Sequence, residues 1–130
     1  MLSNSDKMRL AFDRLTDGDI ETIIAFSHPD VEFVPLLTGH AGEPYRGHEG
    51  LREWHADMEQ VFERLASHLF TVTEYGDIVI AEGELIVIGA GDTPTVNQAV
   101  AWLVWTRDGK ATRIEVLASG EEARVRAGVD

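Results

Sequence analysis

The longest stretch of strand-like sequence covers residues 95–117 and predicts a β-hairpin. Its first arm, residues 95–106, is rich in β-branched and aromatic side chains, and the Asp108-Gly109 pair permits the positive φ angles of a tight turn. Side chains alternate sides along a strand. We expect both faces of this arm to be covered, one by helices and the other by a second sheet or by a second copy of the protein. The reason is that both faces of this arm are apolar: one carries Val100, Trp102 and Val104, and the other carries Ala101, Leu103 and Trp105.

Apolar residues at helical spacing predict three helices before the hairpin, at about residues 5–15, 20–28 and 47–66. In the first helix, Lys7 is assigned to the polar, solvated side. The third helix is the longest and the most amphipathic. Further strands are expected at residues 31–35, 68–75 and 78–88, and a capping box formed by Ser119 and Glu122 predicts a last short helix. This order predicts an α+β fold, in which helices pack on one face of a mostly antiparallel sheet that curls around the third helix.

Composition narrows the possible partners. The 130 residues suffice for one domain, and a net charge of −12 with a pI near 4.7 argues against binding to nucleic acid or to anionic membranes. There is no cysteine, and the five histidines form no close pair of the kind that binds a metal, so we expect neither metal nor cofactor. The first residues lack a signal-peptide pattern and no apolar run approaches the roughly 20 residues of a membrane span, so we expect a cytoplasmic protein.

Five segments of the chain, taken together with their order, resemble the SnoaL-like branch of the nuclear-transport-factor-2-like superfamily. The fold of this superfamily is cystatin-like and ketosteroid isomerase-like. The segments are residues 17–20, 28–35, 45–54, 102–110 and 121–123. The resemblance implies one domain over residues 1–130. It implies a cone, in which a curved sheet wraps a long helix and the N-terminal helices cover a cavity. It also implies a homodimer through the outer sheet face, to which we assign Val100, Trp102 and Val104.

The same resemblance implies a cavity that binds a small apolar molecule such as a polyketide-like ring. The residues expected to contact it are Phe12, Phe33, Tyr45, Trp54, Met58, Asn97, Ala101, Leu103 and Trp105. Asn97 could instead lie exposed at the start of its strand, and Trp105 could be plain core. The isomerase members use a Tyr and two Asp residues, and the matching positions are Ala11 (or Phe12), Phe33 and Ala101, none of which can transfer a proton.

Relocated acid–base groups are the alternative route to catalysis. Glu82 and Glu84 share a strand face with isoleucines, which could raise their pKa values. The interpretation we favour is that Gly83 marks a bulge or rim and that both carboxylates are solvated. His40 lies with Tyr45 on a long loop that could overhang the cavity or simply face solvent. Three functions therefore remain open: a cavity protein that binds an apolar molecule, a cyclase- or isomerase-type enzyme, and a dimeric interaction module without catalysis.

Overall fold

The computed structural model describes residues 2–35, 43–89 and 96–129. Four helices and six strands lie along these residues. The helices are α1 (Asn4–Thr16), α2 (Glu21–Ala25), α3 (Gly47–Val61) and α4 (Gly120–Ala127). The strands are β1 (Ser27–Val34), β2 (Tyr45–Arg46), β3 (Phe62–Tyr75), β4 (Ile78–Gly89), β5 (Val96–Arg107) and β6 (Lys110–Leu117). Their order along the chain is α1-α2-β1-β2-α3-β3-β4-β5-β6-α4.

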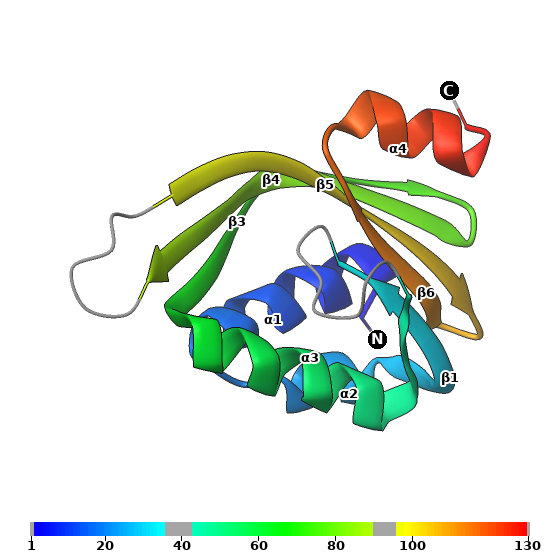
Figure 1. The fold of residues 1–130 in the computed structure, drawn as a ribbon. Coiled ribbons are helices and arrows are strands. Elements are labelled where there is room, and N and C mark those ends of the chain that lie inside the picture. The colour runs from blue at the N-terminus through cyan, green and yellow to red at the C-terminus, as the bar shows by residue number, and fades with distance from the viewer. Residues whose placement is uncertain (1, 36–42, 90–95, 130) are drawn as a thin grey trace.

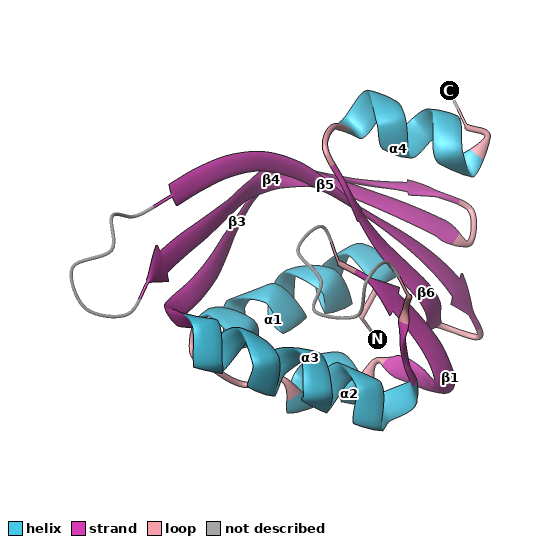
Figure 2. Cartoon of the chain, viewed as in Figure 1, coloured by secondary structure: helices cyan, strands magenta, loops and turns pink. Residues whose placement is uncertain are grey.

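The strands form one curved sheet in the order β2-β1-β6-β5-β4-β3. All neighbours pair antiparallel except β1 and β6, which are parallel. Figure 1 shows the sheet arching over α1, α2 and α3, which lie together on its concave side, while α4 lies on the convex side. The same view coloured by secondary structure makes this separation of the helices plain (Figure 2). The predicted α+β architecture, a mostly antiparallel sheet curved around helices, is confirmed.

The hairpin of β5 and β6 turns where the sequence predicts. Asp108 and Gly109 have φ angles of 55° and 77°, the left-handed conformation that a two-residue hairpin turn requires. Arg107 pairs with Lys110 directly across the turn. This turn fixes the register of the two strands, and with it the face of the sheet on which each side chain lies.

The assignment of the two faces of β5 was wrong. Trp102 lies on the concave side, where its ring is 4.8 Å from that of Phe12 on α1, and Val100 packs in the same core. Ala101 and Leu103 lie on the convex side, packed with Ala123 of α4. Because this strand is apolar on both faces, its sequence contains no alternation that identifies the inner one, and a shift of one residue exchanges them. The second covering layer is supplied by α4 of the same chain.

Three elements also differ from the prediction. The third helix ends at Val61, and residues 62–66, which were expected to be helical, begin β3. Their apolar spacing continues that of the helix, and no glycine or proline marks its end. Residues 36–46, expected to be a loop, include the short strand β2, where Tyr45 pairs with Phe33. β1 also starts earlier than expected, at Ser27.

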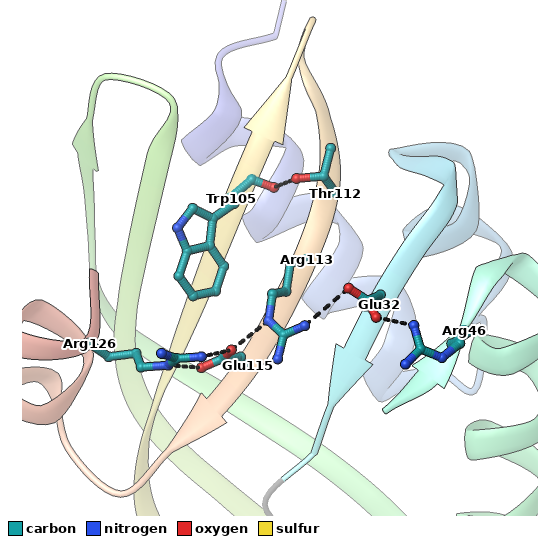
Figure 3. Close-up of polar contacts among 7 residues, drawn as sticks. All are labelled: Glu32, Arg46, Trp105, Thr112, Arg113, Glu115 and Arg126. Atoms are coloured by element: carbon teal, nitrogen blue, oxygen red, sulfur yellow. Dashed lines mark hydrogen bonds and ion pairs between the residues drawn. The ribbon is translucent and has the colours of Figure 1, made fainter. Parts of the chain in front are cut away.

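The convex face carries a row of alternating charges beside α4. Arg46, Glu32, Arg113, Glu115 and Arg126 follow one another across β2, β1, β6 and α4, joined by hydrogen bonds and ion pairs (Figure 3). Ser119 caps α4 by accepting a 3.1 Å hydrogen bond from the Glu122 backbone amide, which is one of the two hydrogen bonds of the predicted capping box. Apolar contact, a cap and ion pairs thus hold α4 on the convex side.

Candidate functional site

A cavity of about 120 Å³ lies between the helices and the concave face of the sheet. Its walls come from one face of α1, from α3 and from the inward-facing residues of β5 and β6, represented by Ala11, Met58, Val104 and Ile114. On α1 the residues that face the cavity recur every three or four positions, as the helical period requires. The amphipathic pattern that predicted these helices therefore also builds the wall of the cavity.

Two aromatic pairs stand in this wall. Phe12 and Trp102 meet edge to face, with ring centroids 4.8 Å apart and planes at 83°. Phe33 of β1 and Trp54 of α3 repeat this arrangement, also at 4.8 Å and 83°. Edge-to-face contact sets the orientation of each ring relative to its partner.

The polar groups of the lining are few, and most already have partners. Ser27 donates its hydroxyl to the carbonyl of Ile23 at 2.7 Å. Asn4 donates to the Thr106 hydroxyl at 3.4 Å, and the Lys7 ammonium donates to the Gly109 carbonyl at 2.8 Å. Among the described residues that line the cavity there is no Asp, Glu or His. Lys7 is the one charged residue among the described residues of the lining.

The indole N–H of Trp54 is a further polar group in the wall. Trp54 is buried, and within the described part of the chain its Nε1 has no hydrogen-bond acceptor. Leaving a buried donor unpaired costs about 1–3 kcal/mol. The ring of Phe33 packs edge to face against this indole.

The structure brings together four of the residues predicted to contact a ligand. Phe12, Phe33, Trp54 and Met58 all line the cavity. Tyr45 lies behind them, buried, with its hydroxyl donating to Asp57 at 3.0 Å. The remaining predicted residues lie elsewhere: Ala101 and Leu103 are covered by α4, Trp105 packs in the same convex cluster, and Asn97 is exposed. Their placement follows from the exchanged faces of β5.

The candidate catalytic carboxylates lie on the convex face, away from the cavity. Glu82 accepts a hydrogen bond from the Thr71 hydroxyl at 3.2 Å and pairs with Arg124 of α4 at 3.6 Å, and its side chain is 40% exposed. Glu84 follows on the same face of β4, opposite Ala99 of β5. Gly83 between them lies opposite a bulge in β3, whereas the alternative interpretation put the bulge at Gly83 itself. His40 lies outside the described residues.

Sequence reasoning missed two groups of cavity residues. Trp102 and Val104 were assigned to the outer face for the reason given above. Lys7 was assigned to solvent because it is charged, yet it precedes Ala11 by four residues and Leu15 by eight, on the same face of α1. That spacing is the signal that could have placed Lys7 beside the apolar stripe.

Two features that would point to other functions are missing from the described residues. No helix there is long and apolar enough to cross a membrane. No group of three or more His, Cys, Asp or Glu side chains is placed to hold a metal ion in this part of the chain. The chemistry available at the cavity is therefore that of apolar walls, one ammonium group and a few neutral polar groups.

Solved structures share this fold over nearly the whole chain. TerC, co-crystallised with polyporic acid, is 28% identical, with 92% of this chain and 93% of TerC covered and a TM-score of 0.78. An NTF2-like protein of unknown function from Burkholderia pseudomallei K96243 is 16% identical, with coverage of 96% and 97% and a TM-score of 0.81. A cystatin-fold protein from Novosphingobium aromaticivorans is 16% identical, with coverage of 90% and 99% and a TM-score of 0.75.

Comparison with the curated proteins gives no match. The family model of the SnoaL-like domain matches residues 8–114, which include most of α1, all of α2 to β5 and most of β6. This span contains both aromatic pairs of the cavity wall. The resemblance found in the sequence is confirmed, and the chain belongs to the SnoaL-like domain family.

Proposed function

We propose that the protein binds a small, apolar, ring-containing molecule in the cavity between α1, α3 and the sheet. The observation that supports this most directly is the wall itself, in which two edge-to-face aromatic pairs stand among aliphatic side chains. The volume of about 120 Å³ is close to that of an apolar cavity of about 150 Å³ that takes up benzene. Transfer of a ring from water into such a site is favourable by roughly 25 cal/mol per Å² of apolar surface.

One relative supports an organic molecule as the ligand. TerC, at 28% identity over 92% of this chain, was co-crystallised with polyporic acid. That observation belongs to TerC, and it is consistent with the apolar lining described above. The fold alone does not determine a ligand, because unrelated functions share it.

Binding is a better interpretation of this cavity than acid–base catalysis through Glu82 or Glu84. A catalytic acid or base must come within hydrogen-bond reach of the reacting atom. Both carboxylates lie across the sheet from the cavity, and Glu82 is engaged with α4. We therefore propose that these two carboxylates serve the structure.

The test uses benzene and naphthalene as probes, with ¹H–¹⁵N spectra of the full chain as the readout. Binding should shift the amide and indole signals of residues in the wall, Trp102 among them, in a saturable manner. Ala11→Leu adds three carbons to the wall and should abolish these shifts. It should also raise the free energy of unfolding by up to about 2 kcal/mol, at about 0.8 kcal/mol per buried CH₂.

Arg9→Leu is the matched control, because Arg9 is on the same helix but exposed. This variant should bind both probes as the parent protein does. If neither probe shifts the wall residues, or if Ala11→Leu leaves binding unchanged, the proposal is wrong. Binding of benzene but not naphthalene would support it and set the size of ring that the cavity accepts.

A further inference from the structure

We propose that the cavity selects a small aromatic anion, whose ring lies against the apolar wall and whose charged oxygen contacts the ammonium group of Lys7. This inference rests on the proposed function, and it adds the chemical class of the ligand. Three observations support it: the position of Lys7 in the lining, the lack of an acidic partner for it among the described residues, and its spacing from the aromatic pair Phe12–Trp102.

The Lys7 ammonium is held at one end of the cavity by neutral groups. It donates to the Gly109 carbonyl at 2.8 Å, in the turn between β5 and β6, and lies 5.9 Å from the centre of the Phe26 ring. An ammonium group has three N–H donors, so two are left after the bond to Gly109. Neither neighbour neutralises the positive charge.

Among the cationic side chains that the structure describes, Lys7 differs from the others because it is half-buried and has no carboxylate partner. The arginines at the convex face and on α3 pair with carboxylates, as Arg113 does with Glu32 and Glu115. Of the lysine and arginine side chains that the structure describes, the others without a carboxylate partner are exposed: Arg9, Arg14, Arg107 and Lys110. Lys7 alone in that set is half-buried, so it has less water to solvate its charge.

The spacing along α1 places the charge and the ring site one turn apart. Lys7 and Ala11 are separated by four residues, so they share a face at a distance of about 6 Å along the axis. Ala11 and its neighbour Phe12 belong to the wall that contains the Trp102 ring. A ring seated against this wall therefore projects a directly attached carboxylate or enolate oxygen toward Lys7.

Electrostatics makes this contact selective. The chain has a net charge of −12, so its surface repels anions at long range, and this repulsion is screened beyond about 8 Å at physiological salt. A charge-assisted hydrogen bond at the end of an apolar cavity acts well inside that distance. Lys7 can thus offset the desolvation of one anionic group, which the rest of the lining cannot do.

The experiment compares benzoate with benzamide, which has the same shape and no charge, by titration monitored in ¹H–¹⁵N spectra. Benzoate should bind about tenfold more tightly than benzamide to the parent protein. Lys7→Met should remove this preference, Lys7→Arg should retain it, and Arg9→Met, which deletes an exposed charge from the same helix, should leave it unchanged. Thermal melts of each variant establish that it is folded.

The outcomes separate this inference from the proposed function. If benzene binds but benzoate is no tighter than benzamide, or if the preference survives in Lys7→Met, the role of Lys7 is overturned while the apolar site stands. Binding of benzene with no binding of either substituted probe also overturns the role of Lys7. If benzene itself does not bind, the proposed function fails and this inference fails with it.

Discussion

Replacing Glu115 by Gln should cost the protein about 2 kcal/mol of stability at neutral pH, and this cost should disappear in acid. The Glu115 side chain is only 5% exposed on the convex face. It accepts hydrogen bonds from Arg113 Nε at 2.6 Å and from Arg126 Nε and Nη2 at 2.9 and 3.0 Å (Figure 3). Arg126 belongs to α4, so these contacts anchor that helix to β6.

The magnitude follows from the exposure of the partners. A hydrogen bond to a charged group contributes about 1.5–3 kcal/mol, so three would sum to roughly 5–9 kcal/mol if all were fully buried. The Arg126 and Arg113 side chains are 54% and 31% exposed, so water can solvate both guanidinium groups after the substitution. Gln also keeps one acceptor oxygen. A net loss of about 2 kcal/mol remains, which lowers Tm by about 6–10 °C in a chain of this size.

The pH dependence has a definite sign. Burial raises the pKa of Glu115, but hydrogen bonds from Arg126 and Arg113 outweigh this effect, and its pKa falls below the ordinary value. A carboxylate whose pKa is lower in the folded than in the unfolded state stabilises the protein above its unfolded pKa of about 4.3. That contribution is lost as the pH falls through the lower, folded value. The difference between the parent protein and Glu115→Gln should therefore be largest near pH 7 and shrink below about pH 4.

Urea denaturation followed by circular dichroism, at pH 7 and at about pH 3, measures both effects. Glu84→Gln is the matched control, because Glu84 is a half-buried carboxylate on the same face with no ion pair among the described residues. This variant should change stability by less than about 0.5 kcal/mol. A loss in Glu115→Gln no larger than in the control, or a loss that is the same at both pH values, would refute the reasoning.

Three further predictions concern the sheet, α4 and the assembly. Gly83→Ala should destabilise the protein by more than about 2 kcal/mol in urea, because the new Cβ would lie 2.0 Å from the carbonyl oxygen of His68 on the paired strand; an unchanged midpoint would contradict this packing. Ser119→Ala should cost about 1 kcal/mol through loss of the α4 cap, and Ser119→Thr should recover most of it. The homodimer implied by the family stays a prediction, and light scattering should give twice the 14.4 kDa chain mass; a mass of one chain would contradict it.

The architecture could be predicted because each element carries its own signal. The apolar stripe of α1, the hairpin turn at Asp108 and Gly109 and the Ser119 cap all depend on residues close together in the sequence. The end of α3 could not be predicted, because the apolar spacing continues into residues 62–66, where pairing with β4 decides in favour of a strand. Tertiary pairing there overrides a local pattern that suits either structure.

The site was harder to predict than the fold, because it depends on which face of a strand is the inner one. β5 is apolar on both faces, so only its pairing register and the position of α4 distinguish Trp102 from Leu103. The row of charges from Arg46 to Arg126 joins residues as far apart as Glu32 and Arg113. No local sequence pattern predicts such contacts, because they form only when β1 and β6 pair in parallel.

The convex face of the sheet carries charged residues that stabilise the fold, and the concave face carries the proposed binding site. Glu32, Glu82 and Glu115 lie on the convex face, where each is engaged with arginine in holding strands or α4 in place. The described residues that line the cavity on the concave face include no acidic residue and no histidine, and Lys7 is the charged residue among them. Substitutions of the convex carboxylates should therefore change stability and its pH dependence while leaving the affinity for a neutral ring unchanged. Substitution of Lys7 should instead lower the affinity for an aromatic anion and change stability little, because its ammonium contacts one backbone carbonyl and faces the site where an anion is proposed to bind.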